Sequence, residues 1–387
     1  MNPPSPPSPT AVAEASTPEF PESDAAFDRW LTRSIARWFA SSARDLPWRI
    51  EPRDPWLSLM SEIMLQQTQV ARVAERFDSF AERFPSPRAM AECSVDDVLA
   101  LWSGLGYYRR ARLLHACASA IAERHDGEVP TTVEALHDLP GVGRYTAGAV
   151  AAIAHGIEAP IVDGNVSRVL LRVHGVEASV DGPGVQAWAW SRATELARAA
   201  GGDVARASEG IMELGATVCT PAAPKCDTCP IRSRCTARSQ GIADRIPQPK
   251  KRATKKPLSI SALVVTDRRG RVLLEQRPSG GLWSGLWQPP SIERAAARHA
   301  SLDSTLESLG LADAIRPPAK PASFGFATTH RDVRVRVWAC PATHAGRARA
   351  ARGTTAAWFA GDELGSLGIA SAHRRMLLVS GIATGGP

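Results

Sequence analysis

The chain has 387 residues, of which 44% are hydrophobic and 22% are charged, a composition ordinary for a globular protein with room for two separate cores. No apolar stretch approaches the length needed to cross a bilayer, so we expect no membrane-spanning segment and no membrane partner. The formal net charge of +7 favours an anionic partner, with nucleic acid as the first expectation and a generic basic surface as the alternative.

The N-terminal residues 1–24 are predicted to form a disordered tail. Seven of the first 21 residues are prolines and large apolar side chains are almost absent, so this segment cannot bury enough surface to order itself. In residues 25–236, apolar side chains recur three and four positions apart, and Pro or Gly interrupts them. This periodicity predicts an all-α domain.

A basic linker is predicted at residues 237–257. The part from Arg245 to Lys256 contains six basic residues, two prolines and no acidic residue, which is typical of a solvated segment that can also touch phosphate.

Residues 258–382 show a different periodicity. Apolar residues alternate with their neighbours at 260–264 and again at 272–274 after a turn signal, which predicts a β-hairpin. A further strand is predicted at 333–337, and helices at 301–311 and 372–379. The C-terminal part is therefore expected to be an α+β domain.

The stretch SEIMLQQTQV, from Ser61 to Val70, is an apolar helical pattern that contains one acidic residue, Glu62. On this pattern alone, a solvent-facing helix glutamate is the better interpretation. The stretch allows two structures. Either Thr68 caps a new helix and leaves Gln66 and Gln67 on an exposed corner, or one helix continues unbroken.

The stretch LPGVGR, from Leu139 to Arg144, connects two helix-like runs, at 132–137 and 145–154. Gly141 and Gly143 let the backbone turn tightly, and their N–H groups, with the N-terminus of the next helix, can bind phosphate oxygens. This arrangement is a helix-hairpin-helix, and a plain connection between helices is the alternative.

The stretch VDGNVSRV, from Val162 to Val169, places Asp163 directly before a helix-like run. An aspartate in this position is most often only an N-cap. The alternative is catalytic, because the helix dipole and free N–H groups favour an ionised carboxylate that could stabilise a developing cation.

Four cysteines follow within 17 residues at the spacing C-x6-C-x2-C-x5-C. Thiolates so close together repel one another and oxidise easily, so the set is typical of a metal centre, and four thiolates suit both structural zinc and a 4Fe–4S cluster. A disulfide knot, the alternative, needs an oxidising compartment, and the sequence has no basic segment followed by an apolar signal. The predicted ligands are Cys219, Cys226, Cys229 and Cys235.

LPGVGRYTAGAV, VDGNVSRVL and the cysteine set, in this order and at these separations, resemble the helix-hairpin-helix Gly/Pro-Asp superfamily of DNA glycosylases. The runs WLS from Trp56, SEIMLQQTQV from Ser61 and LWSGLGYY from Leu101 are similar to its MutY-type adenine glycosylase branch. The resemblance implies a multidomain protein in which an all-α helix-hairpin-helix glycosylase domain with an iron–sulfur cluster loop is joined to an α+β Nudix-like domain. The four cysteines would then hold a 4Fe–4S cluster that orders a basic loop for DNA.

The resemblance also implies a monofunctional glycosylase that removes adenine paired with 8-oxoguanine or guanine in base excision repair. Glu62 would be the general acid that protonates adenine N7 and then helps to activate water, which requires a raised pKa in a partly apolar setting. Asp163 would act on the sugar cation electrostatically or covalently, with Asn165 beside it in the catalytic set. Tyr145 stands where bifunctional members carry lysine. An endonuclease III-like glycosylase with lyase activity is the alternative, and a non-catalytic DNA-binding metalloprotein is the third interpretation.

For DNA binding, the resemblance implies a wedge that enters the duplex and a loop that reads 8-oxoguanine. The reading loop, Phe-Ser-His in the family, corresponds here to Thr328, Thr329 and His330, without the aromatic residue. Arginines 109, 110 and 112 could contact phosphate or form a solvated helix face. Phosphohydrolase activity is not expected, because the Nudix set of carboxylates is missing after Trp287. We expect a monomer that binds double-stranded DNA in the cytoplasm, at the nucleoid, through Gln66, Gln67, Tyr107, Gly141, Gly143, Arg49, Thr329 and His330.

Overall fold

The computed structural model describes residues 20–22, 24–249, 254–278, 280–309, 311–312, 320–341 and 355–383. Most of the predicted tail, residues 1–19 and 23, and residues 250–253 of the predicted linker lie outside the described residues. The chain divides into two units. The first contains Met1–Arg44 and Ala151–Lys250, and the second contains Asp45–Val150 and Lys251–Pro387. The domain boundaries at 236 and 258 stay predictions.

The first unit is helical. Leu31, Ile35 and Phe39 form the buried stripe of its first helix, at the spacing of one helix face. This stripe packs closely against Gly210, where a Cβ atom would come within 2.6 Å of the Ile35 side chain. The unit contains α1 (Ala25–Ser42), the end of α8 (Arg144–His155), α9 (Gly164–His174), α10 (Val185–Ala200), η1 (Gly201–Asp203), α11 (Val204–Thr217), η2 (Cys226–Thr228), η3 (Arg232–Arg234), α12 (Thr236–Ser239) and η4 (Ala243–Arg245).

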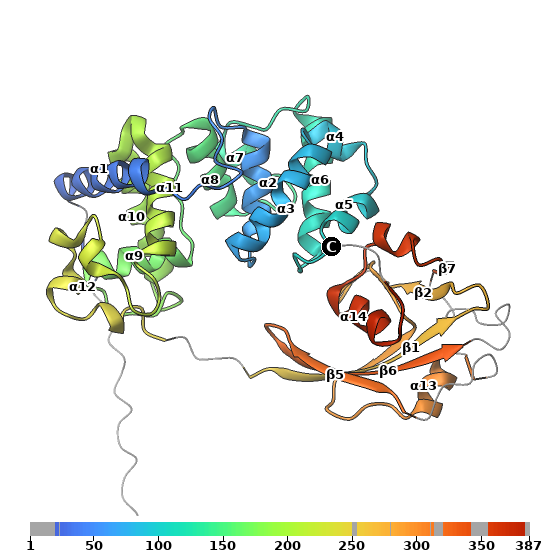
Figure 1. Cartoon of the computed structure of the whole chain (residues 1–387). Coiled ribbons are helices and arrows are strands. Elements are labelled where there is room, and N and C mark those ends of the chain that lie inside the picture. The colour runs from blue at the N-terminus through green and yellow to red at the C-terminus, as the bar shows by residue number, and fades with distance from the viewer. Residues whose placement is uncertain are drawn as a thin grey trace, which may run out of the picture. The chain divides into compact units, whose positions relative to one another are not determined.

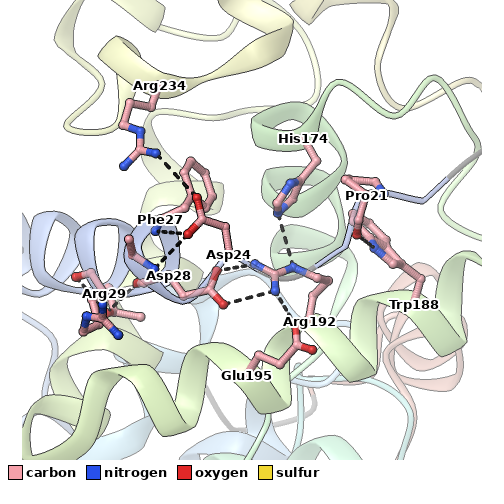
Figure 2. A network of polar contacts seen from close by, with 12 residues as sticks. Pro21, Asp24, Phe27, Asp28, Arg29, His174, Trp188, Arg192, Glu195 and Arg234 are labelled. Atoms are coloured by element: carbon pink, nitrogen blue, oxygen red, sulfur yellow. Dashed lines mark hydrogen bonds and ion pairs between the residues drawn. The ribbon is translucent and has the colours of Figure 1, made fainter.

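A buried ion pair joins α1 to α10 in this unit (Figure 2). Arg192 bonds to both carboxylate oxygens of Asp28, and each side chain is only 2% exposed. Arg192 also pairs with Glu195 and donates to His174 Nε2 at 3.4 Å. Burial lowers the pKa of His174 to about 4, so this imidazole is neutral at physiological pH and can accept the bond.

The second unit begins with a set of helices. Asp54 caps the first of them by accepting a hydrogen bond from the Leu57 N–H at 2.9 Å, and proline at the first helical position suits this start. Phe80, Phe84 and Trp102 pack their rings together in the core. The helices are α2 (Pro55–Leu65), α3 (Val70–Arg83), α4 (Pro87–Ala91), α5 (Val95–Leu101), α6 (Arg109–Arg124), α7 (Val133–His137) and the start of α8.

The same unit contains a mixed β-sheet whose described strands run in the order β3-β2-β1-β6-β5, with β4 paired to β1 and β7 paired to β2. Among the named strands that the structure describes, β1 and β6 form the one parallel pair, with Ile260 opposite Val335. Helix α14 (Ser371–Val379) covers one face of the sheet and α13 (Leu302–Ser308) the other (Figure 1). The strands are β1 (Lys256–Thr266), β2 (Val272–Gln276), β3 (Trp287–Gln288), β4 (Ser291–Arg294), β5 (Ala322–Ala327), β6 (Arg331–Pro341) and β7 (Ala356–Phe359), and η6 spans Glu363–Ser366.

The predicted hairpin is confirmed. Strands β1 and β2 pair antiparallel with Thr266 opposite Val272, and Asp267 accepts hydrogen bonds from the Arg269 and Arg271 N–H groups in the turn. The strand predicted at 333–337 lies within β6, and helices form at α13 and α14. The predicted fold class is therefore confirmed for the helical part and for the α+β part. None of the described helices is both long and apolar enough to span a bilayer.

Candidate active site

Glu62 lies in the middle of α2 and is 8% exposed. Its neighbours Met60, Ile63 and Met64 are each at most 1% exposed, because most of this short helix is enclosed by the second unit. The solvent-facing interpretation of Glu62 is therefore wrong. Glu62 is enclosed within the second unit, as a general acid with a raised pKa would need to be.

At the corner after α2 the predicted break is confirmed, but the predicted cap at Thr68 is wrong, and only Gln67 of the two glutamines is exposed. Helix α2 ends at Leu65 and α3 begins at Val70, so the helix is broken. Thr68 does not cap α3, because the N-cap position belongs to Gln69 and no side chain caps it. Gln67 is exposed and has a left-handed backbone with φ of +56°, which is uncommon for a residue with a side chain.

The hairpin glycines have different roles. Gly141 has φ of +79°, and a Cβ atom there would lie 2.7 Å from Leu113 Cβ, so the turn requires glycine. Gly143 has ordinary φ and open space around it, at the exposed start of α8. The first explains the tight turn, and the second leaves the backbone accessible to a phosphate.

The start of α8 contacts the end of α2. Gln66 Nε2 donates to Thr146 Oγ1 at 3.4 Å, and Thr146 is 2% exposed. Tyr145 precedes Thr146 and is half-buried. The structure therefore brings Gln66 beside the helix that carries Tyr145.

Asp163 is the N-cap of α9 in the first unit, and it is half-buried. Its Oδ1 accepts from the Val166 N–H at 2.7 Å, and its Oδ2 accepts from Asn165 Nδ2 at 3.0 Å. Burial raises the pKa of Asp163, although these hydrogen bonds act in the opposite direction. The N–H groups thus lower the pKa of Asp163, as predicted, but desolvation raises it by more.

Arg168, which the sequence analysis did not single out, holds the Asn165 side chain that bonds to Asp163. Arg168 Nη2 donates to Asn165 Oδ1 at 2.8 Å, and its Nε donates to the Cys219 carbonyl at 2.7 Å. Gly215 allows the close approach, because a Cβ atom there would lie 2.7 Å from Asn165 Cβ. The signal was present in the spacing, since Asn165 and Arg168 are three positions apart and so share one helix face.

The four cysteines line one cavity, together with the fully buried Arg172 and the exposed Arg232 and Arg238. Arg172 Nη1 lies 3.4 Å from Cys219 Sγ. All seven cysteines of the chain are described, and none forms a disulfide. Among the described residues, no three side chains of the metal-binding types are close enough together to hold a single ion.

The chemistry of this set fits a cationic centre. Burial raises the pKa of Cys229 to about 12, and the neighbouring sulfurs of Cys219 and Cys235 raise it further. Burial also raises the pKa of Cys226 and Cys235. Thiolates would be unfavourable here without a metal, whereas a metal centre deprotonates its thiol ligands.

The remaining predicted DNA contacts lie in the second unit. Tyr107 is 47% exposed, has φ of +47°, and shares a hydrogen bond with the exposed Thr329 through their hydroxyl groups. His330 is exposed beside Thr329 in the turn between β5 and β6, and Arg49 is half-buried. The structure therefore brings the predicted wedge and the predicted reading loop together.

The three arginines after Tyr107 are not equivalent. Arg109 is exposed and remains available to phosphate, whereas Arg110 is 7% exposed and cannot form a solvated face. Arg112 donates from Nη2 to the Ser284 carbonyl at 2.5 Å. The alternative of a uniformly solvated face is therefore wrong.

Comparisons with known proteins agree with the family resemblance of the sequence. Residues 60–190 match the HhH-GPD superfamily of base excision DNA repair proteins, and residues 261–378 match a NUDIX domain. A thermostable thymine-DNA glycosylase of known structure aligns with 56% of this chain and 100% of its own, at 28% identity and a TM-score of 0.50.

Two curated relatives are both adenine DNA glycosylases. The Homo sapiens protein is 36% identical over 329 residues, which cover 71% of this chain, and the chain spans only 60% of that relative's length. The Mycolicibacterium smegmatis protein is 44% identical over 212 residues, which cover 54% of this chain and 69% of the relative. These matches and the two domain matches confirm the MutY-type resemblance, and the chain belongs to the adenine DNA glycosylase family.

Proposed function

We propose that the protein is a monofunctional adenine DNA glycosylase of base excision repair. The observation that carries the proposal is the buried carboxyl group of Glu62, on a helix whose C-cap residue, Gln66, bonds to the start of the hairpin helix. A buried acid beside a DNA-binding hairpin has the two elements that the reaction needs, a proton donor and a site for the phosphate backbone.

The proposed reaction breaks the N-glycosidic bond of an adenine that has been flipped out of the duplex. Positive charge develops on the sugar while the departing base needs a proton. Glu62 donates that proton to adenine N7 and then helps to activate water. Asp163 stabilises the sugar cation electrostatically or bonds to it covalently, and both routes remain open.

The proposed reaction ends at an abasic site. Strand cleavage through a Schiff base requires an amine nucleophile. In this chain the position after the hairpin that would supply it is occupied by Tyr145 at the start of α8. A phenol cannot form a Schiff base, so we propose that Tyr145 is a hydrogen-bonding neighbour of the reacting groups.

The proposed substrate is double-stranded DNA in which adenine is paired with 8-oxoguanine or guanine. Support comes from the hydrogen bond between Tyr107 and Thr329, which connects the residue proposed to enter the duplex to the loop proposed to read the opposite base. We propose that a monomer performs this reaction in the cytoplasm, at the nucleoid.

We further propose that the cavity between the four cysteines holds a 4Fe–4S cluster. A polynuclear cluster needs space among its ligands, and all four cysteines line one cavity. The cluster would order the segment that carries Arg232, Arg234 and Arg238, whose exposed side chains can then bind DNA phosphates.

Glu62→Gln tests the catalytic proposal. The variant should lose about 10²–10⁴-fold in single-turnover adenine release, because general acid catalysis contributes that much, and it should still bind the duplex. Glu75→Gln, an exposed glutamate on α3, is the matched control and should retain activity. Full activity in Glu62→Gln would contradict the mechanism.

The choice of duplex tests the substrate. Adenine release is measured on duplexes that carry adenine opposite 8-oxoguanine, guanine or thymine, each with and without alkali treatment. Strand breaks should appear only after alkali. Equal release opposite thymine would contradict the proposed specificity, and a borohydride-trapped protein–DNA adduct would contradict the monofunctional reaction.

Elemental analysis tests the cluster. We expect about four irons and four acid-labile sulfides per chain, with a broad visible absorbance band, and loss of all three in Cys229→Ser. One zinc per chain without iron would contradict the cluster. Cys117→Ser, at a buried thiol outside the set, is the control.

A further inference from the structure

Two loops of the second unit carry the residues proposed to enter the duplex, and both have unusual backbones. Gln67 and Tyr107 have φ of +56° and +47°, in the left-handed region that costs about 1–2 kcal/mol for a residue with a side chain. Such conformations persist only where surrounding contacts hold them. The contacts that hold these two loops therefore determine whether the side chains are ready to enter DNA.

Arg110 contacts the first of these loops, which carries Gln67. Its Nη1 donates to the Ile63 and Met64 carbonyls at 3.0 and 2.7 Å. These belong to the last turn of α2, where carbonyls lack a helical partner and the dipole favours a cation. Its Nη2 donates to Thr68 Oγ1 at 2.7 Å, within the corner itself. One guanidinium thus fixes the end of α2 and the turn that follows it.

Arg110 also holds the second loop. The same Nη2 lies 3.2 Å from both the Leu105 and the Gly106 carbonyls, directly before Tyr107. The guanidinium carbon lies 5.6 Å from the centre of the Tyr107 ring and 5.1 Å from that of Trp102, at cation–π distance. Among the described residues, no carboxylate forms an ion pair with Arg110. Its charge is compensated by backbone carbonyls and rings of the two loops.

We propose that Arg110 is a positioning residue that sets the two duplex-entering loops relative to each other, acting through Gln67 and Tyr107 and not on the substrate. This inference rests on the proposed function. A lysine cannot replace the arginine, because one ammonium group lacks the planar fork that reaches carbonyls on both sides. The cost of Arg110→Lys should therefore fall on base extrusion and not on the chemical step.

The test compares Arg110→Lys with Arg124→Lys, an exposed arginine at the other end of α6 that keeps its charge. Single-turnover adenine release is measured on a paired duplex and on a duplex whose target adenine lies in a small unpaired bubble. Arg110→Lys should lose about 10–100-fold on the paired duplex, since a displacement of about 1 Å can cost 10²-fold, and less than about threefold on the bubble. Arg124→Lys should match the wild type on both.

Equal losses on both substrates would overturn the proposal, and a salt-dependent loss of affinity would show a phosphate contact instead. Amide hydrogen exchange of the free protein provides a readout that does not need activity. Exchange should increase at residues 66–69 and 104–107 in Arg110→Lys and nowhere else. If wild-type protein released no adenine, the proposed function would fail, while unchanged exchange in Arg110→Lys would refute the positioning role.

Discussion

Arg168 and Cys219 are joined by a hydrogen bond from the guanidinium Nε to the backbone carbonyl, 2.7 Å long. The same guanidinium holds the Asn165 side chain, and Asn165 donates to the Asp163 carboxylate. The proposed cluster loop is therefore connected to the proposed cation-stabilising carboxylate by a chain of hydrogen bonds within the first unit. The orientation of Asp163 therefore depends in part on Arg168 and on the Cys219 carbonyl.

The first prediction concerns Asn165. Asn165→Ala removes one hydrogen bond to Asp163 and leaves the helix cap to Val166 in place. Adenine release should fall by about 10–100-fold, because misplaced reacting groups cost that much, with little change in duplex affinity. Single-turnover kinetics measure this. Gln186→Ala, which removes an exposed amide of the same unit, should retain the wild-type rate, and a wild-type rate in Asn165→Ala would contradict the prediction.

The second prediction concerns the ionisation of Asp163. Because burial raises its pKa above the ordinary 3.8, the folded state holds the proton more tightly than the unfolded state, and ionisation above that pKa costs stability. The proposed reaction needs the carboxylate, so the rate of adenine release should fall as the pH drops through a value higher than the pKa of an ordinary aspartate. A rate profile from pH 4 to 8 measures it.

Asp163→Asn gives the corresponding test of stability. Asparagine also caps a helix, so the variant should be inactive but at least as stable as the wild type at pH 7. Unfolding with urea measures the free energy. A loss of more than about 1 kcal/mol would mean that the carboxylate stabilises the fold, against the expected sign.

The third prediction concerns the buried pair of Asp28 and Arg192. Asp28→Asn removes the buried ion-pair partner of Arg192, whose side chain is 2% exposed, and leaves only the pair with the half-buried Glu195, so it should lower the free energy of unfolding by up to about 3–5 kcal/mol. The double change Asp28→Leu with Arg192→Met should cost less than either single change. The control is Asp203→Asn, in an exposed pair with Arg206, which should cost less than about 1 kcal/mol. Equal losses in the buried and exposed variants would refute the prediction.

The fourth prediction concerns His373, which belongs to α14 and packs with 0% exposure against the Trp283 ring. Burial lowers its pKa to about 3, whereas an unfolded histidine titrates near 6.5. As the pH falls, His373 therefore takes up a proton in the unfolded state before it does so in the folded state. Stability should be fully present above about pH 6.5 and be lost below it, by up to about 1.4 kcal/mol per pH unit.

The check for His373 is urea unfolding between pH 4 and 7. His373→Leu should weaken this pH dependence, while His330→Gln, at an exposed histidine of the same sheet domain, should leave it unchanged. An identical slope in wild type and His373→Leu would exclude His373 as its source.

Features set by local spacing were predictable from the sequence. The hairpin glycines and the cap at Asp163 each depend on neighbours a few residues away, and so do the strand alternation of β1 and the meeting of the four cysteines at one cavity. The broken helix at Gln67 was one of two open possibilities. Its cap was assigned to Thr68, but Thr68 instead accepts a hydrogen bond from Arg110 in a distant helix. Tertiary contacts replaced the local cap.

Features set by burial were not predictable. Periodicity could not decide whether Glu62 faces solvent, because nearly every side of α2 is covered. Arg110 and Arg168 look like ordinary surface charges in the sequence, and only their carbonyl partners show otherwise. The pKa of Asp163 depends on desolvation, which local sequence does not report.

The left-handed backbones of Gln67 and Tyr107 have a consequence for engineering. Glycine adopts such torsions without steric conflict, so Gln67→Gly or Tyr107→Gly should relieve local strain. A selection for thermal stability alone would favour substitutions of this kind. It would yield more stable proteins that lack the side chains proposed to open the double helix.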